Sequence, residues 1–212
     1  MPSKNKMNIR RWFRGYLFYP ILAASLLDFT TPIKSEVNFQ IAPAINVVYV
    51  DTEDLEEILR RETQRVQIAR IIPSSQKYLE TIMRNAYSKG LSPEEIVALI
   101  KAESSWDPKA KSIKGATGLM QLMPGVRKTM DVKDPYDPFE GIEKGTTHLM
   151  ELKEKYRDPR IYLAAYNAGE GAVNRWLRGG WDGSIHTIPY RETRNYVRGV
   201  IRTAESLRQS NL

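Results

Sequence analysis

The chain has 212 residues, which suits one compact domain with extensions, and 42% of them are hydrophobic, enough for a sizeable core. Its formal net charge is +7, but the first 14 residues hold five basic side chains and no acid, which leaves +2 for the other 198. We therefore expect no nucleic-acid-binding face. The absence of cysteine excludes disulfides, thiolate zinc sites, a thiol nucleophile and a lipidated N-terminal cysteine.

The N-terminal segment combines this basic cluster with a short apolar run at residues 12–27. Such an order is typical of a secretory signal. The run is shorter than the roughly 20 residues that span a bilayer comfortably. We expect residues 1–30 to be a signal peptide or an N-terminal membrane anchor that sends the rest of the chain out of the cytoplasm. An ordinary amphipathic or buried helix is the alternative.

Residues 31–75 are expected to be a linker followed by an amphipathic helix. Residues 45–50 favour β-structure, and residues 54–72 place apolar side chains near one face of a helix that Pro73 ends. This helix is either a spacer or an element that packs against the domain after it.

From residue 76 to residue 208 the pattern predicts a mostly helical globular domain. Proline and glycine separate its apolar segments, as expected at helix ends and turns. The expected helices are 76–89, 93–105, 116–123, 138–156, 159–167, 171–177 and 190–208.

The expected helix at residues 93–105 has a clear beginning and carries an acid on its apolar side. Ser92 and Glu95 form the S-x-x-E pattern of a capping box around Pro93, a residue that suits the first helical position. Glu103 follows Leu99 by four residues, so it projects from the face that packs into the core. Burial there raises the pKa of a carboxyl, as a glycosidase acid requires. Periodicity alone, however, favours a structural glutamate that is hydrogen-bonded or salt-bridged at the core edge.

Three separated motifs surround this acid and reverse that preference. They read ESSWDPKA from residue 103 with GATGLMQLMP from residue 115, then AAYNAG from residue 164, then IPYRET from residue 188. In this order, across about 130 residues, they resemble the lytic transglycosylases of the soluble-transglycosylase (SLT) domain family, within the lysozyme-like superfamily.

The resemblance implies a mostly α (α+β) lysozyme-like fold whose groove binds peptidoglycan. The implied reaction cleaves the β-1,4 bond between N-acetylmuramic acid and N-acetylglucosamine and forms 1,6-anhydromuramic ends. Glu103 matches the single acid/base catalyst, and no cofactor or metal is implied. The matching substrate-binding residues are Ser112, Met120, Gln121, Tyr166, Asn167 and Glu192.

Two other functions remain open at this point. A hydrolytic muramidase on the same fold requires a second carboxylate, for which Asp107 and Glu192 are the candidates near the motifs. A non-catalytic peptidoglycan-binding assembly module would keep only the groove. His148 and His186 are isolated in sequence, so we expect surface or core roles for both.

The expected setting is the periplasm or cell envelope. The partners would be peptidoglycan glycan strands, the inner membrane through the N-terminal segment, and a protein of an envelope machinery.

Overall fold

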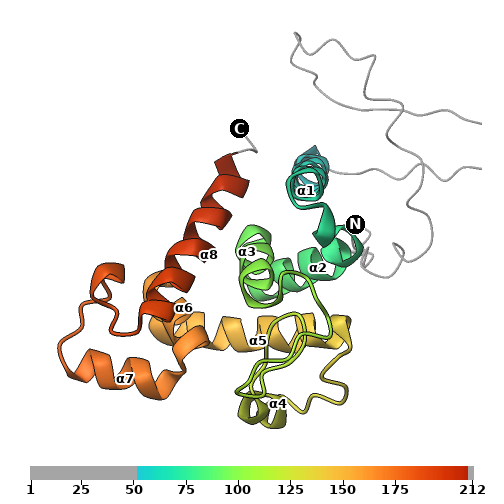
Figure 1. Ribbon diagram of the computed structural model, residues 1–212. Helices are drawn as coiled ribbons and strands as arrows, with labels where there is room; N and C mark the ends of the chain where they lie inside the picture. Colours follow the sequence, from blue (N-terminus) through green and yellow to red (C-terminus); the bar gives the residue numbers. More distant parts are fainter. Residues whose placement is uncertain (1–51, 210–212) are drawn as a thin grey trace, which may run out of the picture. The chain divides into compact units, whose positions relative to one another are not determined.

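The computed structural model describes residues 52–209, which form helices joined by loops and turns (Figure 1). From Glu53 onward the chain forms one compact unit. The mostly helical prediction is confirmed, but the described residues contain no β-strand for the expected α+β component. The α-helices are α1 (Thr52–Ile71), α2 (Leu79–Lys89), α3 (Pro93–Ser104), α4 (Pro124–Thr129), α5 (Pro138–Tyr156), α6 (Pro159–Ala168), α7 (Glu170–Arg178) and α8 (Arg191–Gln209), and the 3-10 helices are η3 (Pro73–Tyr78) and η4 (Ile185–Thr187).

Three expectations lie outside the described residues, namely the signal or anchor segment at 1–30, the linker that begins at residue 31 and, within it, the β-favouring stretch at 45–50. Within the described range, no helix combines the length and apolar character that crossing a membrane requires.

Helix α3 is the central element of the core. It lies between α2 and α8 and packs against both, while α5 passes beneath and packs against α2 and α6 (Figure 1). Its apolar face is closed to solvent, since Ile96, Leu99 and Ile100 have no exposed surface. Because burial of such side chains is the main source of folding free energy, the packing holds α3 in place. The last turn of this helix, which carries Glu103, is therefore set on a rigid support.

The start of α3 confirms one half of the predicted capping box and corrects the other. The Ser92 hydroxyl accepts a hydrogen bond from the backbone N–H of Glu95 at 3.4 Å. The Glu95 side chain instead accepts a hydrogen bond from the Tyr162 hydroxyl on α6 at 2.5 Å. Burial raises the pKa of Glu95, while the Tyr162 hydroxyl lowers it. Glu95 thus joins two helices in the core instead of closing the cap.

We expect Tyr162→Phe to destabilise the fold by about 1 to 3 kcal/mol, because it leaves the buried Glu95 carboxyl without its partner. Urea unfolding at pH 7 measures the loss. Tyr136→Phe, on a side chain that is 39% exposed, is the control and should leave stability unchanged. Equal stability of the Tyr162→Phe variant and the wild type would show that this bond contributes nothing.

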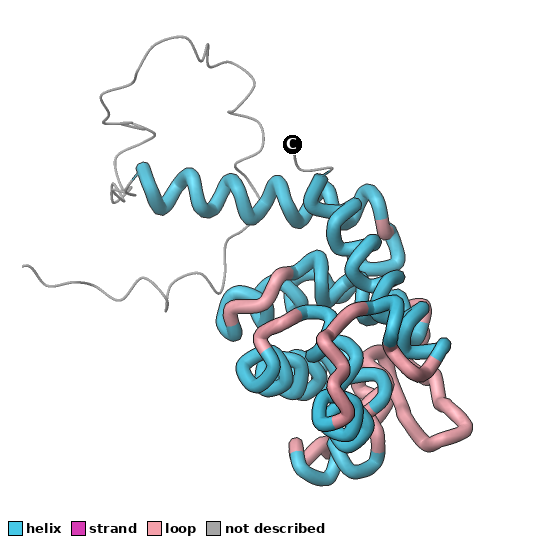
Figure 2. The backbone as a smooth tube through the Cα atoms, turned by 90° about the vertical axis from the view of Figure 1, so that its left-hand side faces the viewer, coloured by secondary structure: helices cyan, strands magenta, loops and turns pink. Residues whose placement is uncertain are grey.

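Helix α1 contributes to the core instead of acting only as a spacer. Its Ile68 has no exposed surface, and the Gln64 side chain donates to Glu94 and accepts from the Tyr87 hydroxyl, both at 2.5 Å. The first turns of α1 extend away from the other helices (Figure 2), and Leu59 there is 63% exposed. The C-terminal half of α1 therefore belongs to the same packed unit as the domain after it.

The predicted helix at residues 116–123 is wrong. This segment is a compact loop with isolated bridges from Thr117 to Lys111 and to Leu122. Gly118 has a φ of 78° and lies against Pro135, so that a Cβ atom at residue 118 would meet the Pro135 carbonyl oxygen at 2.7 Å. Left-handed backbone of this kind interrupts a helix. The short helix α4, which the sequence analysis did not predict, supports the loop, since Arg127 donates to the carbonyls of Gly115 and Leu122.

Candidate active site

Glu103 lies in the last turn of α3, where the chain leaves the helix through two residues with left-handed backbone. These are Ser105 and Trp106, with φ of 51° and 73°. The Glu103 side chain is partly buried. Burial raises the pKa of this carboxyl from 4.5 to about 7; Tyr196 lowers it and the negative charge of Glu192 raises it. At neutral pH a substantial fraction of Glu103 is therefore protonated and able to donate a proton.

Tyr196 is a neighbour of Glu103 whose role sequence reasoning missed. Its hydroxyl is buried and forms no hydrogen bond of standard geometry, yet it lies close enough to stabilise the Glu103 carboxylate. Burial and the nearby carboxylate raise the pKa of the Tyr196 phenol well above its usual range. The phenol thus keeps its proton and remains a donor for Glu103. The sequence did carry a signal, because Tyr196 follows Glu192 by four residues, a spacing that puts both on one helix face.

Tyr166 comes from α6 and faces the same carboxyl. Its hydroxyl donates to the backbone carbonyl of Met120 at 2.9 Å. Burial, followed by the charge of Glu103, raises the pKa of the Tyr166 phenol well above 10. Its ring lies against His148, with the two ring centroids 5.5 Å apart. Tyr166 is therefore a fixed, protonated phenol beside Glu103.

Asn167 and Glu192 stand at the junction of α6 and α8. The Thr193 hydroxyl donates to the Asn167 side-chain carbonyl at 2.7 Å, which ties the end of α6 to the first turn of α8. That bond leaves the amide N–H groups of Asn167 available as donors. Glu192 precedes Thr193 and is exposed. These contacts bring residues from two distant motifs to one place.

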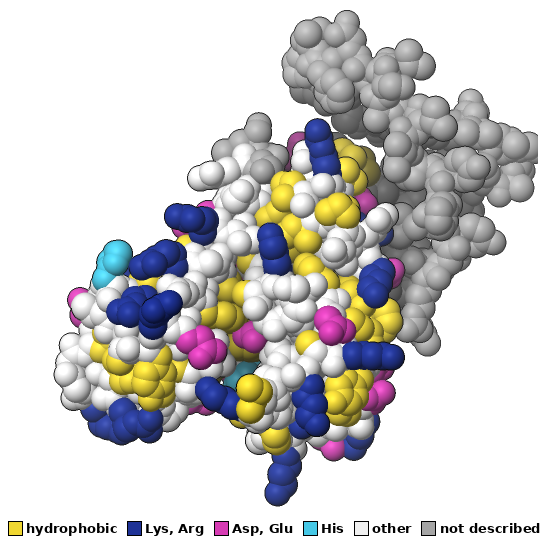
Figure 3. Space-filling model, viewed as in Figure 1, with side chains coloured by type: hydrophobic (Ala, Val, Ile, Leu, Met, Phe, Trp, Pro, Cys, Tyr) yellow, Lys and Arg dark blue, Asp and Glu magenta, His cyan; other side chains and the backbone are white. Residues whose placement is uncertain are grey.

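A groove of about 640 Å³ runs beside these residues. Figure 3 shows a hollow at this part of the surface, with acidic side chains at its edge. Its walls include Tyr166, Asn167 and Glu192 from the predicted set. Glu103 is not among the lining residues, but it interacts electrostatically with two of them, Tyr166 and Glu192. The groove and the raised-pKa acid therefore form one site.

The other three predicted binding residues have structural contacts and do not line this groove. The Ser112 hydroxyl accepts from the backbone N–H of Ala116 at 3.0 Å. The Met120 side chain has no exposed surface. Its backbone carbonyl contributes to the site by accepting the hydrogen bond of the Tyr166 hydroxyl. The Gln121 amide donates to the carbonyls of Ala110 and Gly118 and so stabilises the loop.

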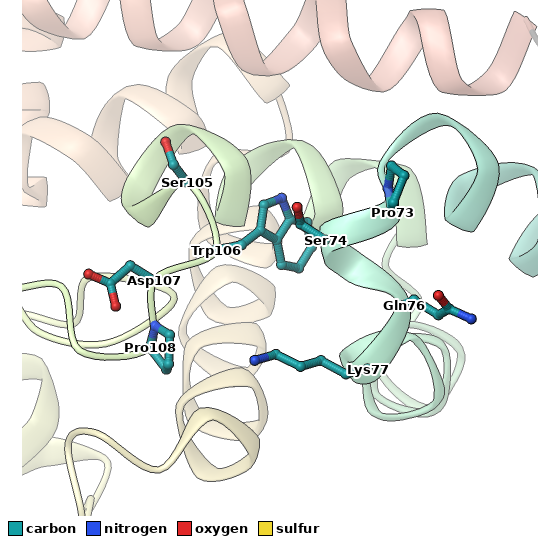
Figure 4. Close-up of a pocket in the computed structure, with 8 residues that line it drawn as sticks. All are labelled: Pro73, Ser74, Gln76, Lys77, Ser105, Trp106, Asp107 and Pro108. Carbon is teal, nitrogen blue, oxygen red and sulfur yellow. The ribbon is translucent and has the colours of Figure 1, made fainter.

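A second hollow, of about 830 Å³, lies at the turn that follows α3 (Figure 4). It is formed by η3 and residues 105–108, and the Lys77 side chain reaches from η3 toward Pro108. Trp106 forms its inner wall and stacks on Tyr78 at 6.1 Å. Asp107, one candidate for a second carboxylate, lines it, but Glu103 and the six predicted binding residues do not, so the groove beside Glu103 is the candidate active site.

The described residues contain no group of three or more His, Asp or Glu side chains arranged to hold a metal ion.

The electrostatic contacts of Glu103 predict opposite effects for two substitutions. Glu192→Gln removes a negative charge and should lower the pKa of Glu103 below about 7, whereas Tyr196→Phe removes a donor and should raise it. Titration of the Glu103 side-chain carboxyl by carbon NMR measures both. Glu205→Gln, an exposed site on α8, is the control and should leave the pKa unchanged. Shifts of the same sign in both variants would contradict the arrangement.

The chain is similar to known proteins in both sequence and structure. Residues 80–186 match the family model of the transglycosylase SLT domain. A putative soluble lytic murein transglycosylase from Haemophilus influenzae is 35% identical over 157 residues, which cover 63% of this chain and 26% of that protein. A structure of an inactive glutamate-to-glutamine mutant of the lytic transglycosylase Slt from Pseudomonas aeruginosa is similar with a TM-score of 0.55 and 33% identity, over 61% of this chain and 24% of that one. The 70-kDa soluble lytic transglycosylase in complex with bulgecin A has a TM-score of 0.57 and 28% identity, over 74% of this chain and 29% of that one. This chain spans about a quarter of the length of these proteins.

Proposed function

Because this chain belongs to the transglycosylase SLT domain family, we propose that it is a peptidoglycan lytic transglycosylase. It cleaves the β-1,4 bond between N-acetylmuramic acid and N-acetylglucosamine and leaves 1,6-anhydromuramic ends. The observation that carries this proposal is the pKa of about 7 for Glu103, beside a groove that Tyr166 and Glu192 line. A carboxyl in that state donates a proton at neutral pH and then accepts one as a carboxylate.

The proposed reaction uses Glu103 twice. Its carboxyl protonates the glycosidic oxygen as the bond to the anomeric carbon of N-acetylmuramic acid breaks, and N-acetylglucosamine leaves with that proton on its hydroxyl. The Glu103 carboxylate then takes the proton of the muramic C6 hydroxyl, whose oxygen bonds to the anomeric carbon. No water is added, so the muramic product is a 1,6-anhydro sugar, in which the C6 oxygen is bonded to the anomeric carbon of the same residue. An attacking group within the substrate benefits from proximity, which is worth roughly 7 to 11 kcal/mol at best.

The neighbours of Glu103 support this sequence of steps. The buried phenol of Tyr196 keeps its proton, so it stabilises the Glu103 carboxylate once that group has given up its own. Tyr166 donates a hydrogen bond to the Met120 carbonyl and lines the groove. Glu192 supplies negative charge, which raises the pKa of Glu103 and favours the positive charge that develops on the sugar. We assign Tyr166, Asn167 and Glu192 to substrate binding, and Ser112, Met120 and Gln121 to the loop that shapes the site.

The products formed from purified sacculi test the reaction. Mass spectrometry should find muropeptides with anhydromuramic ends. Reducing muramic ends would instead indicate a hydrolytic muramidase, with Glu192 as the second carboxylate that activates water. Binding to sacculi without release of any muropeptide would indicate a non-catalytic peptidoglycan-binding module.

We place the enzyme in the periplasm or cell envelope, because its substrate lies there and because the basic and apolar start of the chain is typical of an export signal. This segment is its expected link to the inner membrane, and a protein of an envelope machinery is its expected partner. Fusion of residues 1–51 to a reporter that is active only after export tests the location. An inactive reporter would contradict it.

A further inference from the structure

The groove contains one titratable residue that the reaction does not use, His148 on α5. It lines the groove together with Tyr166, and its side chain is 17% exposed. The imidazole stacks at an angle on the Tyr166 ring, with centroids 5.5 Å apart. Because Tyr166 also faces Glu103, His148 lies two contacts away from the proposed acid.

The charged groups that face His148 do not pair with it. Its Nδ1 atom is 4.0 Å from a carboxylate oxygen of Glu151, which is longer than a hydrogen bond. Glu170, on α7, affects it electrostatically but binds Lys155. Burial lowers the pKa of His148 below its usual value, and Glu170 opposes this effect. At neutral pH the ring is therefore uncharged, with one N–H donor and one nitrogen acceptor.

A partly buried polar ring whose nearest carboxylate oxygen is 4.0 Å away, set in the wall of a groove, has spare hydrogen-bonding capacity for a ligand. A neutral imidazole complements the acetamido group of an N-acetyl sugar, which also offers one N–H donor and one carbonyl acceptor. A structural imidazole would instead have its nitrogens bonded within the protein.

We propose that His148 is a substrate-contacting residue, which binds an acetamido group of the glycan strand at the base of the groove. The proposal rests on the proposed function and extends it by naming an additional sugar-binding side chain. It revises the expectation from sequence that His148 has only a surface or core role. The other histidine in the sequence, His186, is exposed, lies in η4 and does not line the groove.

Nitrogen NMR of the two imidazoles tests this contact directly in the full-length protein at pH 7.5. We expect addition of tetra-N-acetylchitotetraose to shift the His148 ring signals saturably and to leave the His186 signals in place. His186 is thus an internal control in the same sample. Unchanged His148 signals, or equal shifts of both histidines, would overturn the proposal.

Two variants separate binding from packing. His148→Phe keeps a ring against Tyr166 but removes both nitrogens, so we expect KM for soluble glycan strands to rise about tenfold with kcat within about twofold. Its thermal unfolding should match that of the wild type, and His148→Gln, which retains a donor and an acceptor, should recover part of the loss. The matched control His186→Phe should keep the wild-type KM. A wild-type KM in His148→Phe would overturn the contact, whereas failure of the wild type to form anhydromuropeptides would refute the proposed function instead.

Discussion

Glu103→Gln should reduce the release of anhydromuropeptides from sacculi by at least about 1,000-fold, because the amide can neither donate the proton to the leaving oxygen nor accept one afterwards. Both steps of the proposed reaction pass through this one side chain. The shape of the site is retained, since glutamine has nearly the volume of a protonated glutamic acid. Chromatography of the digest with mass detection measures the rate.

Two controls distinguish the loss of the acid/base group from a loss of folding or of sacculus binding. Glu205→Gln, an exposed substitution on α8, should retain full activity. The Glu103→Gln variant should bind sacculi normally and be at least as stable as the wild type at pH 8. This expected order of stabilities follows from the pKa of Glu103, which is raised from 4.5 to about 7 in the folded state. The stability linked to the protonated carboxyl is complete below pH 4.5 and is lost as the pH rises through 7, a loss that the neutral amide avoids. Activity near the wild-type level would exclude Glu103 as the acid.

Local patterns were enough to predict much of this site. The capped helix before Glu103 and its apolar face depend on spacing within one helix, and the structure has both. Tyr166, Asn167 and Glu192 follow from motifs, and they do meet at one groove. In each case the information lies within a few consecutive residues.

The remaining features depend on contacts between residues that are distant in sequence. The loop at 116–123 has the apolar content of a helix, but the approach of Gly118 to Pro135 decides its backbone. Glu95 had a local partner in the capping box, yet its carboxylate binds Tyr162, 67 residues away. The direction in which His148 points likewise depends on how α5 packs beside α6, which periodicity does not specify.

Helix α5 offers a test of how the packing supports the site. Gly145 lies against Met120, and a Cβ atom there would clash with the Met120 sulfur and meet the Met120 Cβ at 2.9 Å. Met120 has no exposed surface into which it could move, and its carbonyl accepts the hydrogen bond of Tyr166. A methyl group at residue 145 must therefore displace the loop that holds this phenol beside Glu103.

We expect Gly145→Ala to destabilise the fold by about 1 to 3 kcal/mol through overpacking, and to reduce activity as well by displacing Tyr166. Gly141→Ala, one turn earlier in α5, is the matched control, because nothing lies within 4 Å of the added atom. It should stabilise the helix by about 0.5 to 1 kcal/mol, the usual gain from replacing glycine with alanine. The free energies of unfolding of the two variants in urea should then differ by roughly 1.5 to 4 kcal/mol. Equal stabilities would mean that Met120 moves aside at no cost. The inference that this contact holds Tyr166 in place would then be wrong.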